Sequence, residues 1–210
     1  MKTKIIIERH GESEGNANRL YLGHTDLPLT AVGEEQAKLC AEYLKDEKID
    51  AVYSSDLKRA YQTALAHAKL RGLRVQTSTQ LREVYAGAWD GKSIPEITEN
   101  YSPELFKSRT MRDFRYPGGE SILEVAHRVY NEIERIAREN EGKTILVASH
   151  SVAIRSFWYL LCGYDDENTL DRVKFIVNSS YSILTYEHGH LTPGEYGLAP
   201  HLNKDIEYLI

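Results

Sequence analysis

Two short, continuous apolar runs constrain the fold of this chain more than any other feature. Residues 4–8 (KIIIE) and 143–150 (KTILVASH) lack the polar and apolar alternation of a strand with one face in water. Strands of this kind are covered on both faces, as in a parallel sheet. A helical pattern follows each run, beginning at Thr30 in the first case and ending at Gly163 in the second. The pattern therefore predicts strands joined by crossover helices.

The segments between these runs continue the alternation. The sequence predicts strands at 50–55 and 73–77, helices at 56–72 and 121–142, and one or two more strands after residue 172. Gly72 is placed to end the first of these helices, and Ser121 with Glu124 forms a capping box at the start of the second. This order predicts an α/β fold, a three-layer sandwich with a mostly parallel central sheet and helices on both faces.

Residues 90–120 break the alternation. They hold Pro95, Pro103 and Pro117, and their helical pieces are short and irregular. We expect a small helical cap insertion at about 90–120 that lies over one end of the sheet. No linker or repeat is visible, so we expect one domain over residues 1–210.

Composition limits the partners and the compartment. The net charge of −5 argues against a general nucleic-acid surface, so any bound anion must be held by a local cluster. No run approaches the roughly 20 apolar residues of a membrane span, and we expect a cytoplasmic protein with no membrane partner. Cys40 and Cys162 lack metal or redox spacing and are expected to be small core residues. A homodimer is left open.

The ends of the predicted strands carry the polar residues that matter for chemistry. Ligands of open α/β sheets bind outside the carboxyl ends of the strands. The first strand ends at Arg9 and His10, and the run at 143–150 ends at His150. Arg59 lies in the first turns of the helix after the second strand, and Glu83 follows the third. The sequence thus predicts that these five side chains meet at one rim.

This set of side chains suits phosphoryl chemistry. Guanidinium groups match phosphate oxygens with planar, forked donors, and a neutral imidazole is a nucleophile toward phosphorus. A carboxylic acid beside them can protonate a poor leaving group. The arrangement requires no metal and no cofactor, because its cationic groups supply the charge stabilisation. The expected partner is a small phosphorylated metabolite.

The chain resembles the histidine phosphatase superfamily, which has the phosphoglycerate mutase-like fold. The resemblance rests on RHGES with Asn16 following, GHTDLPLTAVGEEQA, SSDLKRAYQTA, LREVYAGAWDG, YPGGES and VASHS, in order from about residue 4 to about residue 155. It implies that His10 becomes a phosphohistidine. It implies a phosphate pocket built from Arg9, His10, Asn16, Arg59, His150 and Ser151, with Glu83 as proton donor and later as base.

Substrate contacts are predicted at Gly23, His24 and Tyr85 and at arginines of the insertion. Arg109, Arg112 and Arg115 either meet a carboxylate or second phosphate of the substrate, or form a solvated basic face. Tyr85, with Trp89 and Tyr116, either forms an apolar wall or anchors the cap. Sugar phosphates, phosphoglycerates, phosphoserine and a cobalamin-pathway nucleotide all stay open as substrates.

Three functions compete. The main one is a metal-independent phosphomonoester hydrolase of small phosphorylated metabolites, and the alternative is a cofactor-dependent phosphoglycerate mutase. Mutases usually resemble LNER.YG.LQG where this chain has LREVYAGAWDG, which favours the phosphatase. A catalytically silent phospho-ligand binder is the third reading, but such a protein is expected to have lost His10 or Glu83, and both are present here.

Three residues of the first and last motifs raise separate expectations. Ser151 stands where the family usually has Gly, and its N–H and hydroxyl are expected to face an anion. Gly11 is expected to let the chain turn sharply and approach the anion closely. Glu8, where an apolar or small residue is usual, is expected on the same face as His10 and paired with an arginine or histidine of the pocket, because an unpaired buried carboxylate is costly.

Overall fold

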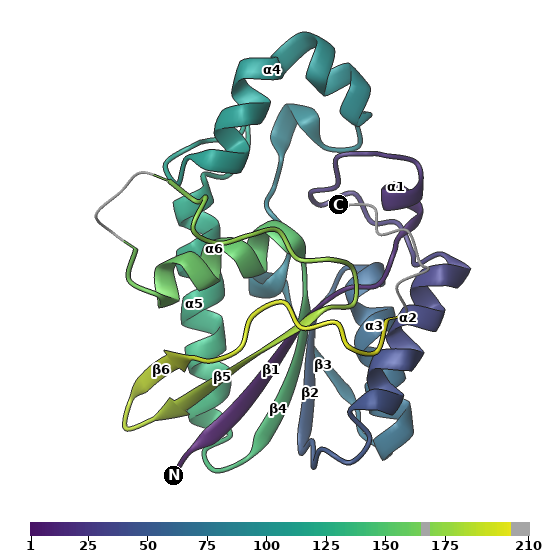
Figure 1. Ribbon diagram of the computed structural model, residues 1–210, viewed down its shortest axis with the longest axis vertical. Helices are drawn as coiled ribbons and strands as arrows, with labels where there is room; N and C mark the ends of the chain where they lie inside the picture. Colours follow the sequence, from purple (N-terminus) through teal and green to yellow (C-terminus); the bar gives the residue numbers. More distant parts are fainter. Residues whose placement is uncertain (165–168, 203–210) are drawn as a thin grey trace.

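A six-stranded sheet forms the centre of the computed structural model, which describes residues 1–164 and 169–202 (Figure 1). The strand order is β3-β2-β4-β1-β5-β6. The parallel strands are β1 (Thr3–Arg9), β2 (Ala51–Ser55), β3 (Val75–Ser78) and β4 (Thr144–Ser149). The last two, β5 (Tyr181–Glu187) and β6 (His190–Pro193), form an antiparallel hairpin added beside β1. The predicted mostly parallel sheet is confirmed.

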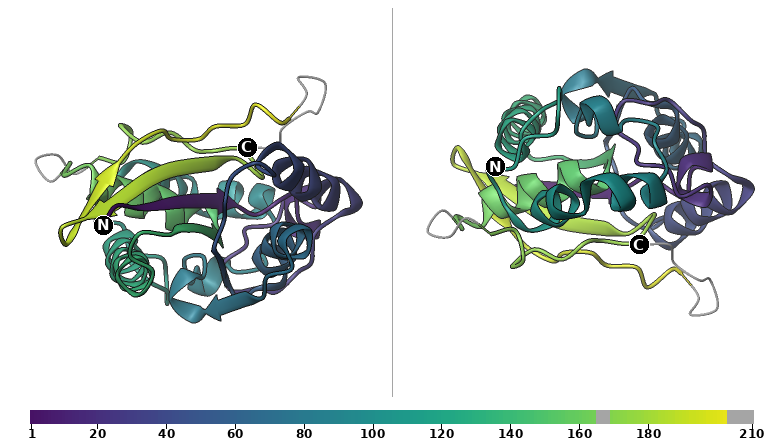
Figure 2. Two further views of the ribbon diagram at one scale, coloured as in Figure 1. Left: turned by 90° about the horizontal axis from the view of Figure 1, so that it is seen from below. Right: turned by 90° about the horizontal axis from the view of Figure 1, so that it is seen from above.

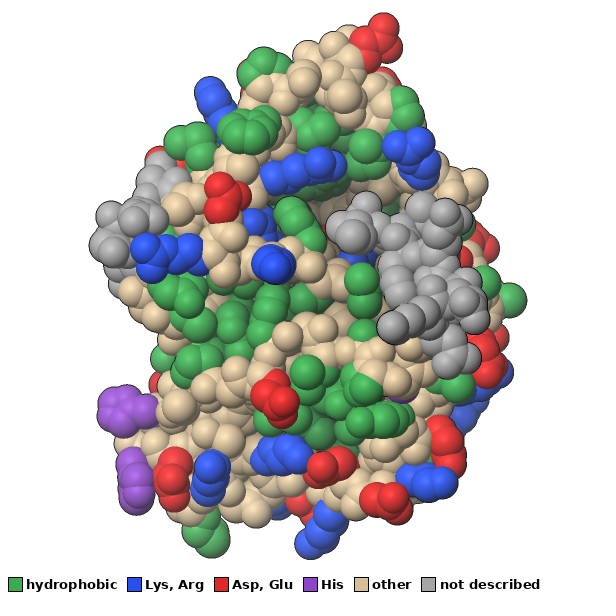
Figure 3. Space-filling model, viewed as in Figure 1, with side chains coloured by type: hydrophobic (Ala, Val, Ile, Leu, Met, Phe, Trp, Pro, Cys, Tyr) green, Lys and Arg blue, Asp and Glu red, His purple; other side chains and the backbone are tan. Residues whose placement is uncertain are grey.

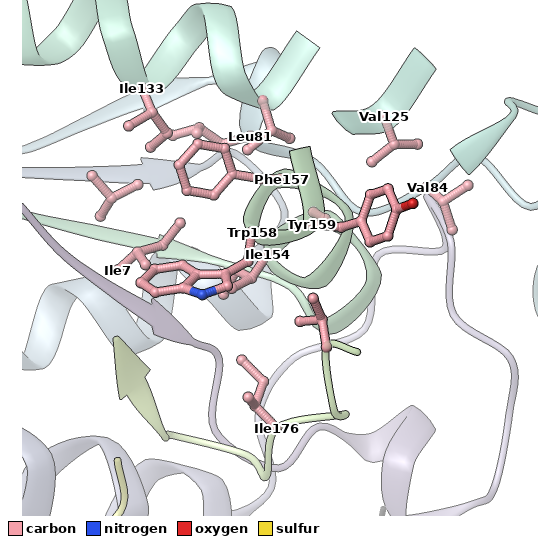
Figure 4. Packing of buried hydrophobic residues seen from close by; sticks show 14 of the residues in the cluster. Ile7, Leu81, Val84, Val125, Ile133, Ile154, Phe157, Trp158, Tyr159 and Ile176 are labelled. Carbon is pink, nitrogen blue, oxygen red and sulfur yellow. The ribbon is translucent and has the colours of Figure 1, made fainter. Parts of the chain in front are cut away.

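Helices cover both faces of the sheet, as Figure 2 shows. Adjacent residues of a strand point to opposite faces, so Ile5 and Ile7 pack with α5 (Ile122–Glu139) and α6 (Ser151–Leu161). Figure 4 shows Ile7 among Ile154, Phe157 and Trp158 of α6. Ile6 instead belongs to the core under α2 (Ala31–Tyr43) and α3 (Lys58–Arg71). The three-layer α/β sandwich is confirmed.

Local signals set the helix ends where the sequence predicts them. Thr30 accepts a hydrogen bond from the N–H of Gly33 at 3.1 Å and caps α2. Gly72 ends α3 with a φ of 65°, which glycine adopts without a steric penalty. Ser121 and Glu124 form the predicted capping box of α5. In the part of the chain that the structure describes, no helix combines the length and the apolar character needed to cross a bilayer.

The segment that breaks the alternation contains α4 (Ile94–Thr110), which lies beyond the carboxyl ends of the parallel strands (Figure 1). Its two pieces are joined across a kink at Tyr101, whose φ of −139° is not helical, and Pro103 follows at the kink. Trp89 is fully buried beneath α4, with ring centroids 5.8 Å from Tyr101 and 5.5 Å from Tyr116. Of the two roles considered for Trp89, an apolar wall of the site or an anchor for the cap, the structure supports the anchor.

Short elements complete the connections. They are α1 (Glu14–Ala17) after β1, and two 3₁₀ turns, Thr79–Leu81 and Gly87–Trp89, between β3 and α4. Asp90, after the second turn, accepts from the backbone N–H groups of Gly23, His24 and Thr25 at 2.7–3.1 Å. The loop after α1 is thereby fixed against the loop that carries Glu83.

Candidate active site

A pocket of about 450 Å³ opens where β1 and α6 meet, beneath α4. Its lining includes the predicted residues Arg9, His10, Asn16, Glu83 and Ser151. The rest of the lining, here called the far side of the pocket, includes Arg19, Tyr21, Ser108, Arg109, Tyr116 and Phe175. Figure 3 shows Lys and Arg side chains around a hollowed part of the surface below α4. The strand ends therefore deliver polar groups to one rim, as the topology predicts.

His10 has the geometry and charge state of a nucleophile. Its Nδ1 lies 2.7 Å from the carbonyl oxygen of Gly11, which can only accept, so Nδ1 carries the proton and Nε2 keeps its lone pair. The side chain is buried, with 4% of its surface exposed. Burial, followed by the nearby guanidiniums of Arg59 and Arg9, holds the pKa of His10 well below its usual 6.5. The imidazole is therefore neutral at physiological pH.

Three buried cationic or imidazole groups surround His10. The rings of His10 and His150 meet edge to face with centroids 5.2 Å apart. Arg59 donates to the carbonyls of Gly23 and Thr25 at 2.8 Å, and Arg9 donates to that of Ile176. Burial lowers the pKa of Arg9 to about 10 and that of Arg59 in the same direction, and it holds the pKa of His150 well below 6.5.

Several buried nitrogen atoms of these groups have no hydrogen-bond partner among the described residues. They are Nε of Arg9, Nε of Arg59 and both ring nitrogens of His150. Buried donors without partners are rare because each costs free energy. Their gathering around one nucleophile is typical of an anion-binding site. Arg59 and His150 are fully buried and lie behind the wall of the pocket rather than on it.

Glu83 is held by the first turn of α6. One carboxylate oxygen accepts from the N–H of Ala153 at 2.9 Å and the other from that of Val152 at 3.1 Å. Its carbonyl oxygen accepts from Arg128 at 2.8 Å and from the ring of His24 at 3.0 Å. Both the side chain and the backbone are therefore fixed, and the carboxylate lines the pocket on the side of Ser151.

The remaining predicted phosphate contacts, Asn16 and Ser151, both line the pocket. The side-chain oxygen of Asn16 accepts from the N–H of Ser13 at 3.1 Å and from the amide of Asn178 at 3.3 Å, which leaves its NH₂ group as a donor. Ser151 begins α6, but the N–H groups of the next two residues are bonded to Glu83. The helix start thus presents Glu83, together with Ser151 itself, to the pocket.

The structure places most of the predicted substrate contacts outside the lining of the pocket. Gly23, His24 and Tyr85 do not line the pocket; Tyr85 is 43% exposed, and its ring is tilted against that of His24 with centroids 5.2 Å apart. Arg112 lies off the lining as well. Arg115 is exposed and bonded to Glu124, so the structure places it away from the pocket.

The side chains on the far side of the pocket were mostly missed by the sequence analysis. Arg109 is the insertion arginine that lines the pocket, and Arg19, Tyr21 and Ser108 join it. Arg19 has a left-handed φ of 53°, and its carbonyl accepts from the N–H of Ile94 at 2.8 Å. Its position three residues after Asn16 is the one sequence signal that links it to the site.

Gly11 serves a different purpose from the one expected. Its φ is not among the positive values, but a Cβ there would lie 2.4 Å from the carbonyl oxygen of Gly33. The motif therefore needs glycine because its backbone packs directly on the start of α2, a requirement that the sequence did not predict. The N–H of Gly11 donates to the hydroxyl of Thr63 on α3 at 3.0 Å, which fixes the turn from the other helix.

Comparisons with known proteins agree with this geometry. The chain is 36% identical over 190 residues to phosphoserine phosphatase 1 of Hydrogenobacter thermophilus, covering 88% of this chain and 87% of the relative. It is 39% identical over 160 residues to phosphoglycerate mutase-like protein 4 of Arabidopsis thaliana, covering 74% and 69%. A phosphoserine phosphatase mutant from Entamoeba histolytica, solved with phosphoserine, superimposes with a TM-score of 0.81 at 28% identity, covering 96% and 100%.

A mycobacterial hydrolase superimposes with a TM-score of 0.87 at 25% identity, covering 95% of this chain and 100% of the other. The model of the histidine phosphatase superfamily (branch 1) matches residues 5–197, which include all the strand ends described above. The match thus spans nearly the whole chain, as the resemblance of its motifs predicts. The chain belongs to the histidine phosphatase superfamily, branch 1.

Proposed function

We propose that this chain is a phosphatase of small phosphomonoesters that carry a carboxylate, with phosphoserine as the first candidate. The observation that supports the second anion is the pair of arginines on the far side of the pocket. Arg19 and Arg109 line it, and within residues 1–164 and 169–202 neither has a carboxylate partner. By contrast, Arg115 and Arg128 outside the lining each pair with a glutamate.

The chemistry follows from the two fixed groups of the site. The Nε2 lone pair of His10 forms a bond to phosphorus while the bond from phosphorus to the leaving oxygen breaks. Glu83, in its protonated form, gives its proton to that oxygen. A water molecule then attacks the phosphohistidine, Glu83 takes a proton from it, and the bond between nitrogen and phosphorus breaks. Inorganic phosphate leaves and His10 is regenerated.

Positive charge near the reacting phosphoryl group stabilises the transition state. Arg9 and Arg59 lie close enough to lower the pKa of His10, so they also act on charge that develops at phosphorus. Their side-chain hydrogen bonds go to backbone carbonyls, and within the described residues neither forms an ion pair with a carboxylate, although the charge of Glu83 acts on both to raise their pKa. The pocket has a volume of about 450 Å³, a size that suits a small ligand.

The names of the relatives support a carboxylate on the substrate. Phosphoserine and phosphoglycerate both carry one, and so does glucosyl-3-phosphoglycerate, the substrate named for another structural neighbour. In a bound substrate with its phosphoryl group at His10, the carboxylate would lie toward Arg19 and Arg109. Hydrolysis is favoured over mutase activity by the sequence LREVYAGAWDG around Glu83.

The test measures phosphate release, in EDTA, from phosphoserine and 3-phosphoglycerate and from phosphoethanolamine, which resembles phosphoserine without its carboxylate. We expect the carboxylated esters to be hydrolysed with much higher kcat/KM. His10→Ala should abolish turnover together with the acid-labile phosphoenzyme. No release of phosphate from any ester would refute the proposed phosphatase activity. Equal rates for phosphoserine and phosphoethanolamine would refute the proposed recognition of a carboxylate on the substrate.

A pair of arginine variants tests the far side of the pocket. Arg109→Ala should lower kcat/KM for phosphoserine by roughly 10- to 100-fold, the value of a hydrogen bond to a charged group. It should leave p-nitrophenyl phosphate unaffected, because that ester has no carboxylate. Arg115→Ala is the matched control from the same segment, since its guanidinium pairs with Glu124. Equal effects of the two variants would argue against a role for Arg109.

A further inference from the structure

Glu8 is a fully buried carboxylate two residues before the nucleophile. One of its oxygens lies 2.8 Å from Nε2 of His67 on α3, and the other accepts from the hydroxyl of Ser179 at 2.8 Å. The expectation that Glu8 pairs with a histidine is confirmed, but His67 is not a pocket residue. Glu8 lies on the face of β1 that packs under α2 and α3, because it alternates with Ile7 along the strand.

Ser179 has a backbone conformation that serine rarely adopts. Its φ is 57°, at the third position of the turn 177–180, where glycine or asparagine is the usual residue. A strained residue persists only where its surroundings hold it. Here the hydroxyl of Ser179 supplies the reason, because it bonds Glu8 and also reaches the carbonyl of Gln36 on α2 at 3.2 Å.

The same turn holds the backbone of the catalytic motif. The N–H of Ser179 and the side-chain amide of Asn178 both donate to the carbonyl oxygen of His10, each at 3.1 Å. The N–H of Arg9 donates to the carbonyl of Ser180 at 2.9 Å. Consecutive residues of the turn therefore fix consecutive residues of the motif, and Asn178 also contacts the phosphate-pocket residue Asn16.

We propose that Glu8 is a positioning residue for catalysis: through Ser179 it locks the turn that holds His10 and Arg9 in place. The inference rests on the phosphatase reaction proposed above. Glu8 does not touch the substrate, since it is fully buried and does not line the pocket. Its role is to orient the attacking nitrogen, and orientation errors of about 1 Å cost on the order of 100-fold in rate.

The alternative is that Glu8 and His67 are only a structural ion pair. A structural pair would change the free energy of unfolding but not the rate per folded molecule. A positioning pair lowers kcat and the rate of phosphoenzyme formation, with little change in KM, because substrate still binds to Arg59, Arg19 and Arg109, which the turn does not hold. The kcat and KM values of folded variants therefore separate the two.

Glu8→Leu and Ser179→Ala both remove the bond between the two side chains. We expect each to lower kcat for phosphoserine by roughly 10- to 100-fold and to weaken inhibition by vanadate in parallel. The double variant should lose no more than either single one, because both break the same contact. Glu8→Gln keeps the shape of the side chain and an acceptor oxygen for the hydroxyl of Ser179, so it should retain most of the wild-type kcat.

Thr3→Val is the control, because Thr3 is fully buried at the other end of β1 and its hydroxyl bonds the carbonyl of Asn140 at 3.3 Å. It should lower stability without changing kcat. Unchanged kcat in Ser179→Ala would overturn the proposal, as would equal losses in Glu8→Gln and Glu8→Leu. If Glu8→Leu does not fold, Ser179→Ala and Glu8→Gln decide alone. An inactive wild type would instead refute the phosphatase.

Discussion

The two buried histidines of the site predict how the stability of the protein changes with pH. The pKa values of His10 and His150 are held well below 6.5, mainly by burial and then by neighbouring cations. As the pH falls below 6.5, the unfolded chain therefore takes up protons that the folded protein does not. The free energy of unfolding then decreases toward low pH, and the loss continues until the pH reaches the depressed pKa values of the folded state.

The size of this effect follows from the linkage relation. A difference of one bound proton changes stability by about 1.36 kcal/mol per pH unit. Between about pH 7.5 and about pH 5.5, each histidine should lower the free energy of unfolding by about 1.4 kcal/mol, and the two together by about 2.7 kcal/mol. Ion-paired carboxylates such as Glu124, whose pKa lies near 2, contribute only at lower pH, so they do not mask this window.

Urea unfolding at the two pH values measures the loss in free energy of unfolding, and the variant His150→Gln isolates the contribution of His150. His24 and His201 also have lowered pKa values, so the difference between wild type and variant is more informative than the wild type alone. The free energy of unfolding of the variant should fall by about 1.4 kcal/mol less than that of the wild type over the same pH range. Inorganic phosphate should reduce the loss in free energy of unfolding for the wild type, because the negative charge of bound phosphate offsets the positive charge of the arginines beside the two histidines. A pH dependence identical in wild type and variant would refute the reasoning.

Two further predictions concern the acid and the packing of the motif. Glu83→Gln should lower kcat/KM for alkyl phosphates by roughly 100-fold or more and change that for p-nitrophenyl phosphate little, since an aryl oxygen leaves without a proton and kcat/KM does not depend on the later attack by water. Equal losses in kcat/KM would remove Glu83 as the acid. Gly33→Ala should lower the free energy of unfolding by about 1 to 3 kcal/mol, because its Cβ would lie 1.9 Å from the carbonyl oxygen of Glu12. The control in urea unfolding is Val32→Ala, since Val32 is 45% exposed on the same helix, and an equal loss there would contradict the packing argument.

The residues that the sequence predicts well are those at the ends of parallel strands. Arg9, His10 and His150 follow continuous apolar runs, and the carboxyl ends of parallel strands must meet at one edge. Their convergence depends on topology alone, so the pattern of strands and helices is enough to predict it. Helix caps such as Ser121 are local for the same reason: the partner lies three residues away.

The residues that the sequence does not place depend on contacts between distant segments. Phe175 lines the pocket and Ser179 bonds Glu8. Both lie in residues 169–180, which form no helix or strand, so no periodic pattern in the sequence predicts where they lie. The choice of His67 as the partner of Glu8 depends on which face of α3 meets β1. Likewise, the need for glycine at position 11 arises from the backbone of Gly33 in another element. Arg19 and Arg109 line one pocket only because α4, which carries Arg109, lies over the end of the sheet.

The hydrogen bonds of the buried arginines explain how an acidic chain attracts an anion. Arg9, Arg59 and Arg155 donate to backbone carbonyls, including those of Ile176, Thr25 and Val173, rather than to carboxylates in the described part of the chain. Carbonyl partners satisfy the donors without cancelling their charge, and Glu83 is the one acidic residue among those described that line the pocket. The positive potential of the pocket therefore persists despite a net charge of −5. The same potential adds to the effect of burial, which is the larger cause, in holding the pKa of His10 well below 6.5, so the cations that would bind phosphate also help to keep the nucleophile unprotonated.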